Sequence, residues 1–325
     1  MKYTAYFDSG TTNSRLYLLD EAGQSIYRSR CAVGAQDSAK ARNGEVQTKA
    51  LHDLYVEALE KCALTEADVA FICISGNVTA QYGVHEVEHL YLPQSAEEFK
   101  KNLFTFAESK YFGREITLVP GVKQITDDFD MTGLIRGEEI ELFGMLDQLN
   151  AKYGEQTIAV AIPGSHTNIA YLRGDAIIGA FSNITGEIFH ALKEETVLAP
   201  ILDNSDGSLD TEWVLKGMKA LNDYGIARAL NLTHAMRILE RNTPLQRRSY
   251  AEGVIFGDIA QSAQISTEKM FPECRTLVIS ADGEVGELYK TLFSTCDVFD
   301  TVELLPSAEE PWSLIGFKKL FGYGK

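Results

Sequence analysis

Two apolar runs near the N-terminus flank the polar stretch Asp8-Ser9-Gly10-Thr11-Thr12-Asn13. Residues 4–7 before it and residues 15–19 after it read as two strands joined by a tight turn. Small hydroxyl residues beside a glycine leave backbone N–H groups uncovered, and such groups in a tight turn form a concave anion site. An aspartate at the strand end is suited to hold a metal ion or its waters. The stretch therefore predicts a site for the phosphates of a magnesium nucleotide.

The same strand–turn–strand unit occurs a second time, around Gly164-Ser165-His166-Thr167-Asn168. The apolar residues 157–162 precede this turn, and the apolar residues 169–172 follow it. In both copies a further turn then leads to a third apolar strand. Because self-similarity of this kind marks a repeated architecture, the sequence predicts two related units that each present one such turn.

The bulk properties limit the class of protein. A length of 325 residues is long for one hydrophobic core, so we expect two domains, 1–152 and 153–325, with a terminal helix that could pack back on the first. The net charge of -16 argues against nucleic-acid or acidic-membrane partners. Five cysteines without metal-ligand spacing, no signal-like N-terminus and no membrane-length apolar run predict a cytoplasmic protein. A homodimer is left open.

Polar turns also follow two other predicted strands. Residues 69–74 form a continuous apolar run, as in a strand covered on both faces, and Ser75-Gly76-Asn77 follows it. Open α/β sheets place ligands at the carboxyl ends of such strands, although a plain turn fits this stretch equally well. A strand at residues 276–280 leads through Ala281-Asp282-Gly283-Glu284 into a helix, an arrangement that suits nucleotide contact.

Apolar periodicity and capping signals predict the helices, and residues 28–44 read as a loop. Helices are expected at 45–63, 95–107 (from a capping box at Ser95), the second half of 134–146, 210–221, 225–240, 244–263 and 312–321. Arg136, Glu138 and Glu139 begin the helix within 134–146; the helix dipole favours the two acids there, whereas the arginine suggests a paired or ligand-binding role. A helix capped by Thr185 or Asn183 would carry Glu187 and His190 on one face.

The order of these motifs resembles the 2-dehydro-3-deoxygalactonokinase family, within the actin-like ATPase and sugar-kinase superfamily. The resemblance extends over nearly the whole chain. It is carried by Asp8-x-Gly10-x-Thr12-Asn13-x-Arg15, Val119-Pro120-Gly121, Ile135-Arg136-Gly137-Glu138-Glu139, Ile162-Pro163-Gly164-Ser165-His166 and Thr185-Gly186-Glu187 with His190. It implies an α/β fold of two ribonuclease-H-like (actin-like ATPase) domains flanking a central cleft.

The resemblance also implies an activity and the residues that serve it. Such kinases transfer the γ-phosphoryl group of ATP, with Mg²⁺, to the 6-hydroxyl of 2-dehydro-3-deoxygalactonate in galactonate catabolism. The implied metal anchor is Asp8. The implied nucleotide-binding residues are Asp8, Gly10, Thr11, Thr12, Gly164, Ser165, Thr167, Ala281 and Gly283. The implied sugar-acid-binding residues are Asn13, Arg15, Ser75, Gly76, Asn77 and Arg136.

The identity of the catalytic base stays open at this stage. Many relatives in the superfamily use an aspartate at the start of the second half, where this chain has the Gly164-Ser165-His166 turn. His166 is therefore the first candidate, followed by Glu138 and Glu187. We expect structural roles for His52, His85, His89 and His234.

Several features depart from the family pattern, and they leave alternatives. The turn at Ser75-Gly76-Asn77 differs from the expected methionine–valine–glycine pattern, Asp282 and Glu284 bring acids to the nucleotide turn, and Gly133 replaces a common aspartate. One alternative is a kinase of another small sugar acid or polyol on the same fold. Another is a non-catalytic sensor of nucleotide or sugar, which the joint presence of Asp8, Thr12, Arg136 and His166 disfavours. A filament-forming role lacks any sequence support.

Overall fold

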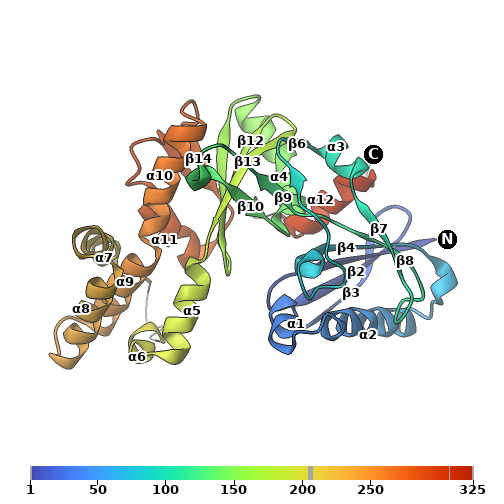
Figure 1. The fold of residues 1–325 in the computed structure, drawn as a ribbon, viewed down its shortest axis with the longest axis horizontal. Coiled ribbons are helices and arrows are strands. Elements are labelled where there is room, and N and C mark those ends of the chain that lie inside the picture. The colour runs from blue at the N-terminus through green and yellow to red at the C-terminus, as the bar shows by residue number, and fades with distance from the viewer. Residues whose placement is uncertain (1, 204–207, 307, 324–325) are drawn as a thin grey trace. The chain divides into compact units, whose positions relative to one another are not determined.

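The computed structural model describes residues 2–203, 208–306 and 308–323, and the chain forms two compact units (Figure 1). Unit 1 consists of Met1–Gly154, Gly174–Ala180 and Ala308–Lys325. Unit 2 consists of Glu155–Arg173 and Phe181–Ser307. The C-terminal segment therefore belongs to the same unit as the N-terminus. Among the described residues, no helix has the length and apolar character needed to cross a membrane.

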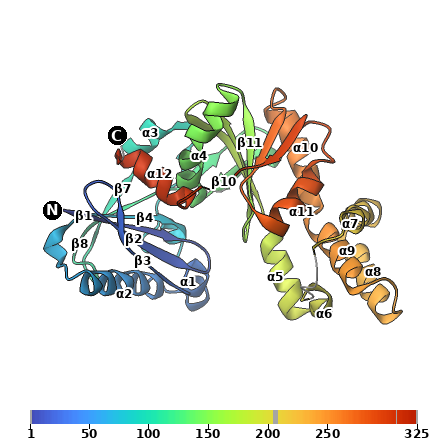
Figure 2. The same cartoon turned by 180° about the vertical axis from the view of Figure 1, so that it is seen from behind.

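Unit 1 is built on a six-stranded sheet in the order β3-β2-β1-β4-β8-β7 (Figure 2). Its strands are β1 (Tyr3–Ser9), β2 (Ser14–Leu19), β3 (Ser25–Cys31), β4 (Val69–Gly76), β7 (Phe104–Glu108) and β8 (Arg114–Leu118). The first three strands are antiparallel neighbours, whereas β4 runs parallel to both β1 and β8. The carboxyl ends of β1 and β4 therefore lie at the same edge of the sheet, with Ser9 opposite Gly76.

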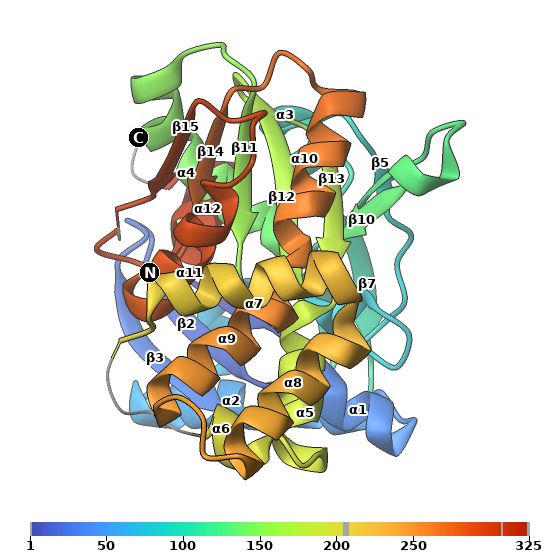
Figure 3. The same cartoon turned by 90° about the vertical axis from the view of Figure 1, so that its left-hand side faces the viewer.

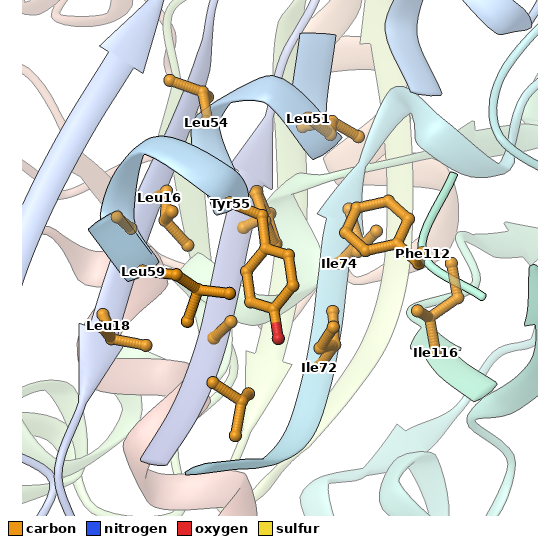
Figure 4. Packing of buried hydrophobic residues seen from close by; sticks show 14 of the residues in the cluster. Leu16, Leu18, Leu51, Leu54, Tyr55, Leu59, Ile72, Ile74, Phe112 and Ile116 are labelled. Atoms are coloured by element: carbon orange, nitrogen blue, oxygen red, sulfur yellow. The ribbon is translucent and has the colours of Figure 1, made fainter. Parts of the chain in front are cut away.

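Helix α2 (Glu45–Lys61) covers one face of this sheet, and its apolar side chains form the core shown in Figure 4. Leu51, Leu54 and Tyr55 of α2 pack against side chains that include Leu16 and Ile74 of the sheet. Each fully buried leucine contributes roughly 2 kcal/mol to stability through the hydrophobic effect. The hydrophobic spacing of residues 45–63 thus predicted both this helix and the face that it buries.

The side chain of Tyr6 lies on the other face of the sheet, because successive residues of a strand point to opposite faces. Phe317 of α12 (Trp312–Phe321) stacks on Tyr6 with ring centroids 4.3 Å apart. Helix α12 also packs closely on α4 (Glu138–Tyr153): a methyl group at Gly316 would lie 1.8 Å from the Ile140 carbonyl oxygen. Glycine at this crossing therefore allows the two helix backbones to touch.

The remaining elements of unit 1 are short. A three-stranded sheet has the order β10-β9-β5. The strands and helices are β5 (Leu90–Tyr91), β6 (Gln94–Ser95), β9 (Val122–Gln124), β10 (Gly133–Ile135), α1 (Ala35–Ala41) and α3 (Ala96–Lys101). Short 3-10 helices occupy Glu66–Asp68, Asn77–Thr79 and Phe129–Met131. Strand β6 pairs with Ala176 and Ile177 of β13.

Unit 2 repeats the strand order of unit 1, with β15-β14-β11-β12-β13 in place of β8-β4-β1-β2-β3 (Figure 3). The strands are β11 (Ile158–Ile162), β12 (Thr167–Arg173), β14 (Thr276–Ile279), β15 (Thr301–Leu304) and β13 (Ala176–Asn183). Of β13, residues 176–180 belong to unit 1 and residues 181–183 to unit 2. Strand β11 is antiparallel to β12 and parallel to β14, as β1 is to β2 and β4. The predicted α/β fold with two ribonuclease-H-like domains of the actin-like ATPase class is therefore confirmed.

Seven helices complete unit 2. They are α5 (Thr185–Glu195), α6 (Ala199–Leu202), α7 (Thr211–Tyr224), α8 (Ile226–Ile238), α9 (Pro244–Phe256), α10 (Asp258–Met270) and α11 (Gly283–Phe293) within the described residues. Helices α7 and α9 make backbone contact, because a methyl group at Gly217 would lie 2.0 Å from the Tyr250 carbonyl oxygen.

Several predicted elements were wrong in extent. The stretch 28–44 was predicted as a loop, but it contains the end of β3 and helix α1. The helix expected over 95–107 has its capping box at Ser95 but ends at Lys101, and β7 follows, since aromatic and β-branched residues favour a strand. The helix expected over 244–263 divides at Gly257 into α9 and α10, in keeping with the weak helix propensity of glycine.

The predicted cap of α5 was also wrong. The N-cap residue is Ile184, which has no side-chain cap, and Thr185 is the first helical residue. The Thr185 hydroxyl instead lies 3.0 Å from that of Thr167, while Asn183 contacts Ser262.

Candidate active site

The first turn closes on itself and rests on the start of α1. Its Gly10 N–H donates to the Asn13 carbonyl at 2.9 Å. The N–H groups of Ala35 and Gln36 donate to the carbonyl oxygens of Gly10 and Thr11, at 3.1 and 2.9 Å. The turn carbonyls therefore face the helix.

The N–H groups of the same turn remain available. Among the described residues, those of Thr11 and Thr12 have no hydrogen-bond partner. Unpaired N–H groups in a turn of this kind form the type of concavity that binds an anion.

Asp8 lies at the end of β1 and is almost fully buried. It pairs with Arg15 across the β1–β2 register, and Arg15 Nη1 lies 3.1 Å from Asp8 Oδ2. The hydroxyl of Ser313, from α12, donates to the same oxygen at 3.1 Å. Both donors use Oδ2, so Oδ1 is the oxygen that stays unpaired among the described residues.

Three segments of unit 1 meet beside this turn. The φ of Gly76 is +96°, and a methyl group there would lie 2.1 Å from the Ser9 carbonyl oxygen. The φ of Gly137 is +113°, and a methyl group there would lie 3.2 Å from the Gly76 Cα. Asn77 Nδ2 donates to Thr11 Oγ1 at 3.3 Å. The turn, the end of β4 and the start of α4 thus form one continuous surface.

Two glutamates at the start of α4 face this surface. Burial raises the pKa of Glu138 to about 8, with further contributions from the charges of Glu139 and Asp8. Burial likewise raises the pKa of Glu141 to about 8, and the charges of Asp8 and Glu138 act in the same direction. Oε2 of Glu138 is enclosed and has no hydrogen-bond partner among the described residues. Glu138 is therefore a carboxyl group that gains and releases a proton near neutral pH.

Arg136 is tied to the chain that follows β4. Its Nη1 donates to the Thr79 hydroxyl, and its Nη2 lies 3.1 Å from the Val87 carbonyl and 3.0 Å from His89 Nδ1. Burial lowers the pKa of Arg136 from its ordinary value. Burial and the charge of Arg136 lower the pKa of His89 to about 4, so the imidazole is neutral at pH 7. A half-buried guanidinium whose hydrogen bonds all go to neutral groups is a favourable partner for an anion.

Some hydroxyls that were predicted to contact ligands lie beneath the surface. The Ser75 hydroxyl is buried, 2.8 Å from the Tyr6 hydroxyl and 3.3 Å from the Phe7 carbonyl oxygen. A chain of buried hydrogen bonds supports the first turn from below: Gln47 Nε2 to Ser9 Oγ at 2.8 Å, Ser9 to Ser14 at 2.6 Å, and Ser14 to the Val33 carbonyl at 2.7 Å.

The second turn, in unit 2, is supported in the same way as the first. The N–H of Glu187, in the first turn of α5, donates to the Ser165 carbonyl at 2.9 Å. A methyl group at Gly186 would lie 2.1 Å from the Gly164 carbonyl oxygen. This contact brings His166 Nε2 within 3.3 Å of Glu187 Oε1, and both side chains are largely exposed. Two of the predicted catalytic residues therefore lie together.

Thr167 is fully buried, and its hydroxyl lies 3.0 Å from that of Thr185 and 2.5 Å from that of Tyr289. The main-chain turn of Gly164 and Ser165 is the part of this motif that is left open to a ligand.

The turn from Ala281 to Gly283 leads into α11, and the φ of Gly283 is +60°. Its acidic neighbour Glu284 forms an ion pair with Arg248 and accepts a hydrogen bond from the Leu209 N–H at 3.2 Å. Arg248 Nε also lies 2.7 Å from Glu252 Oε1. Glu284 is thus held within unit 2 by an arginine that it shares with Glu252.

The structure separates the predicted site residues into two groups. Unit 1 contains most of them: Asp8, Gly10, Thr11, Thr12, Asn13, Arg15, Ser75, Gly76, Asn77, Arg136 and Glu138. Unit 2 holds the others: Gly164, Ser165, His166, Thr167, Glu187, Ala281 and Gly283.

Three further residues of unit 1 were missed. Glu141 could have been found, because it follows Glu138 by three residues on one helix face. His89 and Ser313 carry no sequence signal, since each depends on a contact between distant parts of the chain.

The possible metal ligands in unit 1 suit Mg²⁺ better than a metal ion that is coordinated by protein side chains alone. Among the described residues, no group of three or more His, Cys, Asp or Glu side chains is arranged to hold a metal ion. Mg²⁺ keeps several waters and commonly takes one or two carboxylates together with substrate phosphates. Asp8, with one unpaired oxygen next to the open N–H groups of the turn, fits that coordination.

Comparison with known proteins identifies the family of the chain. A family model described as 2-keto-3-deoxy-galactonokinase matches residues 8–307. The protein named Probable 2-dehydro-3-deoxygalactonokinase DgoK1 of Rhizobium meliloti (strain 1021) is 24% identical over 292 residues, which are 89% of this chain and 88% of that protein. A crystal structure from Sinorhizobium meliloti of a protein named for the same kinase activity covers 98% of both chains with a TM-score of 0.74 and 21% identity, and so shares the fold. The chain belongs to the 2-keto-3-deoxy-galactonokinase family.

Proposed function

We propose that the protein transfers the γ-phosphoryl group of ATP to the 6-hydroxyl of 2-dehydro-3-deoxygalactonate, a step of galactonate catabolism. The observation that carries this proposal is the surface in unit 1 where Asp8, the first turn and Glu138 meet at the carboxyl ends of β1 and β4. Phosphoryl transfer depends mainly on positioning and charge neutralisation, and this surface offers groups for both.

The first turn, in unit 1, is assigned to the nucleotide phosphates. Bound Mg²⁺ would neutralise phosphate charge, and Asp8 would hold it through Oδ1 or a water. The N–H groups of Thr11 and Thr12 would bind phosphate oxygens. Unit 2, taken by itself, offers Gly164 and Ser165 for phosphate contact and the turn from Ala281 to Gly283 for adenosine contact.

The sugar acid is assigned to Arg136 and the nearby turn of Gly76 and Asn77. A carboxylate is the natural partner of a guanidinium whose other hydrogen bonds go to neutral groups.

Glu138 is assigned as the base that accepts the proton of the 6-hydroxyl. A base works best when its pKa lies near the operating pH, and burial places that of Glu138 at about 8. Glu138 also lies in the same cluster as Asp8, whereas the His166–Glu187 pair is exposed to solvent. His166 and Glu187 are therefore assigned to phosphate contact and to the orientation of the second turn.

The test is a substrate panel. The full chain is incubated with ATP, Mg²⁺ and a series of sugar acids and polyols, ADP release is followed, and the phosphorylated position is read by ³¹P NMR. We expect the highest kcat/KM with 2-dehydro-3-deoxygalactonate and the phosphate on the 6-oxygen. A higher value with another compound would identify a different sugar kinase. Binding of magnesium nucleotide without phosphorylation of any compound would favour a sensor.

A further inference from the structure

We infer that Ser313, in the C-terminal helix α12, is a positioning residue that fixes the Asp8 carboxylate for binding of the magnesium nucleotide. The inference rests on the proposed function, since it assigns Asp8 to the metal. Ser313 lies outside residues 8–307, the part of the chain that the family model matches. It is 305 positions away from Asp8 in sequence.

The contact is direct and enclosed. Ser313 is 2% exposed, and its hydroxyl lies 3.1 Å from Asp8 Oδ2. Ser313 is the second residue of α12, so the carboxylate also faces the positive end of a helix of 10 residues.

The position of α12 leaves Ser313 little freedom. A methyl group at Gly144 would lie 2.3 Å from the Trp312 carbonyl oxygen, so the backbone of α4 touches α12 next to Ser313. Phe317 stacks on Tyr6, which is two residues before Asp8. The hydroxyl groups of Tyr323 and Thr4 form a hydrogen bond of 2.6 Å. These contacts fix α12 between α4 and β1.

The two donors to Asp8 differ in rigidity. The side chain of Arg15 is 53% exposed and can change rotamer, whereas Ser313 has a short, buried side chain. Because Ser313 holds Oδ2, Oδ1 keeps one orientation, in which it can coordinate the metal or accept a hydrogen bond from a metal-bound water. Without the hydroxyl, the carboxylate would depend on the mobile Arg15 alone and would rotate among several orientations.

The experiment compares three variants of the full chain. Ser313→Ala removes the hydroxyl, Ser313→Thr keeps a hydroxyl, and Tyr323→Phe removes the other hydrogen bond between this segment and β1 without touching Asp8. The readout is the affinity for Mn²⁺ in the presence of ADP, measured by electron paramagnetic resonance. Thermal unfolding of each variant reports whether α12 stays in place.

We expect Ser313→Ala to weaken Mn²⁺ binding about tenfold, in line with the loss of a hydrogen bond to a charged group. Tyr323→Phe should lower the unfolding temperature and leave Mn²⁺ affinity within about twofold, and Ser313→Thr should recover most of the affinity. In turnover, Ser313→Ala should raise the KM for Mg²⁺ more than the KM for the sugar acid. If Ser313→Ala binds Mn²⁺ as the unchanged protein does, or if Tyr323→Phe weakens it equally, the positioning role is wrong.

Failure of the proposed function would look different. If the unchanged protein binds Mn²⁺ with ADP but phosphorylates no sugar acid, the function fails while the comparison of Ser313→Ala with Tyr323→Phe still decides the inference. If the unchanged protein binds no Mn²⁺ with ADP, the inference is overturned as well.

Discussion

Glu138 and Glu141 lie in the first turn of α4, and burial raises the pKa of each to about 8. Glu138→Gln keeps the shape and removes the proton acceptor. We expect kcat to fall about 100-fold or more, as is typical for a lost general base, with little change in nucleotide affinity. Glu141→Gln is the matched control, because it changes the same cluster without the assigned base, and its kcat should stay within about tenfold. Equal losses in both variants would move the base elsewhere, with His166→Gln as the next test.

The same pKa shifts make stability depend on pH in an unusual direction. Glutamates in an unfolded chain titrate near pH 4.3. Between that pH and about 8 the folded state binds more protons than the unfolded state, so stability falls as pH rises through this window. Each group contributes up to about 1.4 kcal/mol per pH unit. Glu141→Gln should flatten the decline of the urea midpoint between pH 5 and 8; an unchanged slope would contradict the shift.

Arg136 can be tested by separating the two substrates. Arg136→Ala should raise the KM for the sugar acid at least tenfold and change the KM for ATP little, because a charge-assisted contact to the carboxylate is lost. Arg114→Ala is the matched control, since Arg114 donates to the carbonyl oxygens of Glu66, Val69 and Ala70 away from the site. A larger effect of Arg136→Ala on the KM for ATP would place Arg136 on the nucleotide side.

At the scale of elements, the two turns share a support that the sequence did not reveal. Each turn offers its carbonyl oxygens to the start of a helix, α1 in unit 1 and α5 in unit 2. Each helix start also has a glycine, where an added methyl group would clash with those oxygens. The methyl group would lie 2.4 Å from the Thr11 carbonyl oxygen at Gly34, and 2.1 Å from the Gly164 carbonyl oxygen at Gly186. The turns are therefore held in place through their carbonyl oxygens.

This support predicts the effect of Gly34→Ala. The added methyl group would displace the first turn, so we expect nucleotide affinity to fall about tenfold and stability to fall by about 1–3 kcal/mol. Gly44→Ala is the control, because its methyl group would clash at 2.2 Å with the Gly83 carbonyl oxygen, elsewhere in unit 1. Isothermal titration with ADP measures the affinity, and equal losses in both variants would show that only stability matters.

Sequence patterns predicted best those elements whose stability depends on residues nearby in the chain. The period of α2, the apolar runs of β1 and β4, and the capping box at Ser95 depend on neighbours in the chain, and the structure contains all of them. Helix α1 was missed because residues 35–41 are mostly polar, and its position depends on the carbonyl oxygens of Gly10 and Thr11. The division at Gly257 was missed because the apolar stripe continues across it.

At the scale of the whole molecule, the doubled turn correctly predicted two units of one topology. Strand order repeats as β3-β2-β1-β4-β8 and β13-β12-β11-β14-β15, so the similarity of two short motifs extended to complete sheets. The contacts around Asp8 were predictable only in part. Arg15 follows from the hairpin register, whereas Ser313 comes from a helix whose return to unit 1 depends on packing with α4 and on Tyr6.

The return of α12 has a consequence for the order of synthesis. Asp8 is synthesised 305 residues before Ser313. At the usual rate of elongation, roughly 10–30 s separate the end of the first long segment of unit 1 from helix α12. During this interval the nascent chain lacks the hydroxyl that donates to Asp8 Oδ2. The contact between β1 and α12 therefore forms only after the intervening residues of unit 2 have been synthesised.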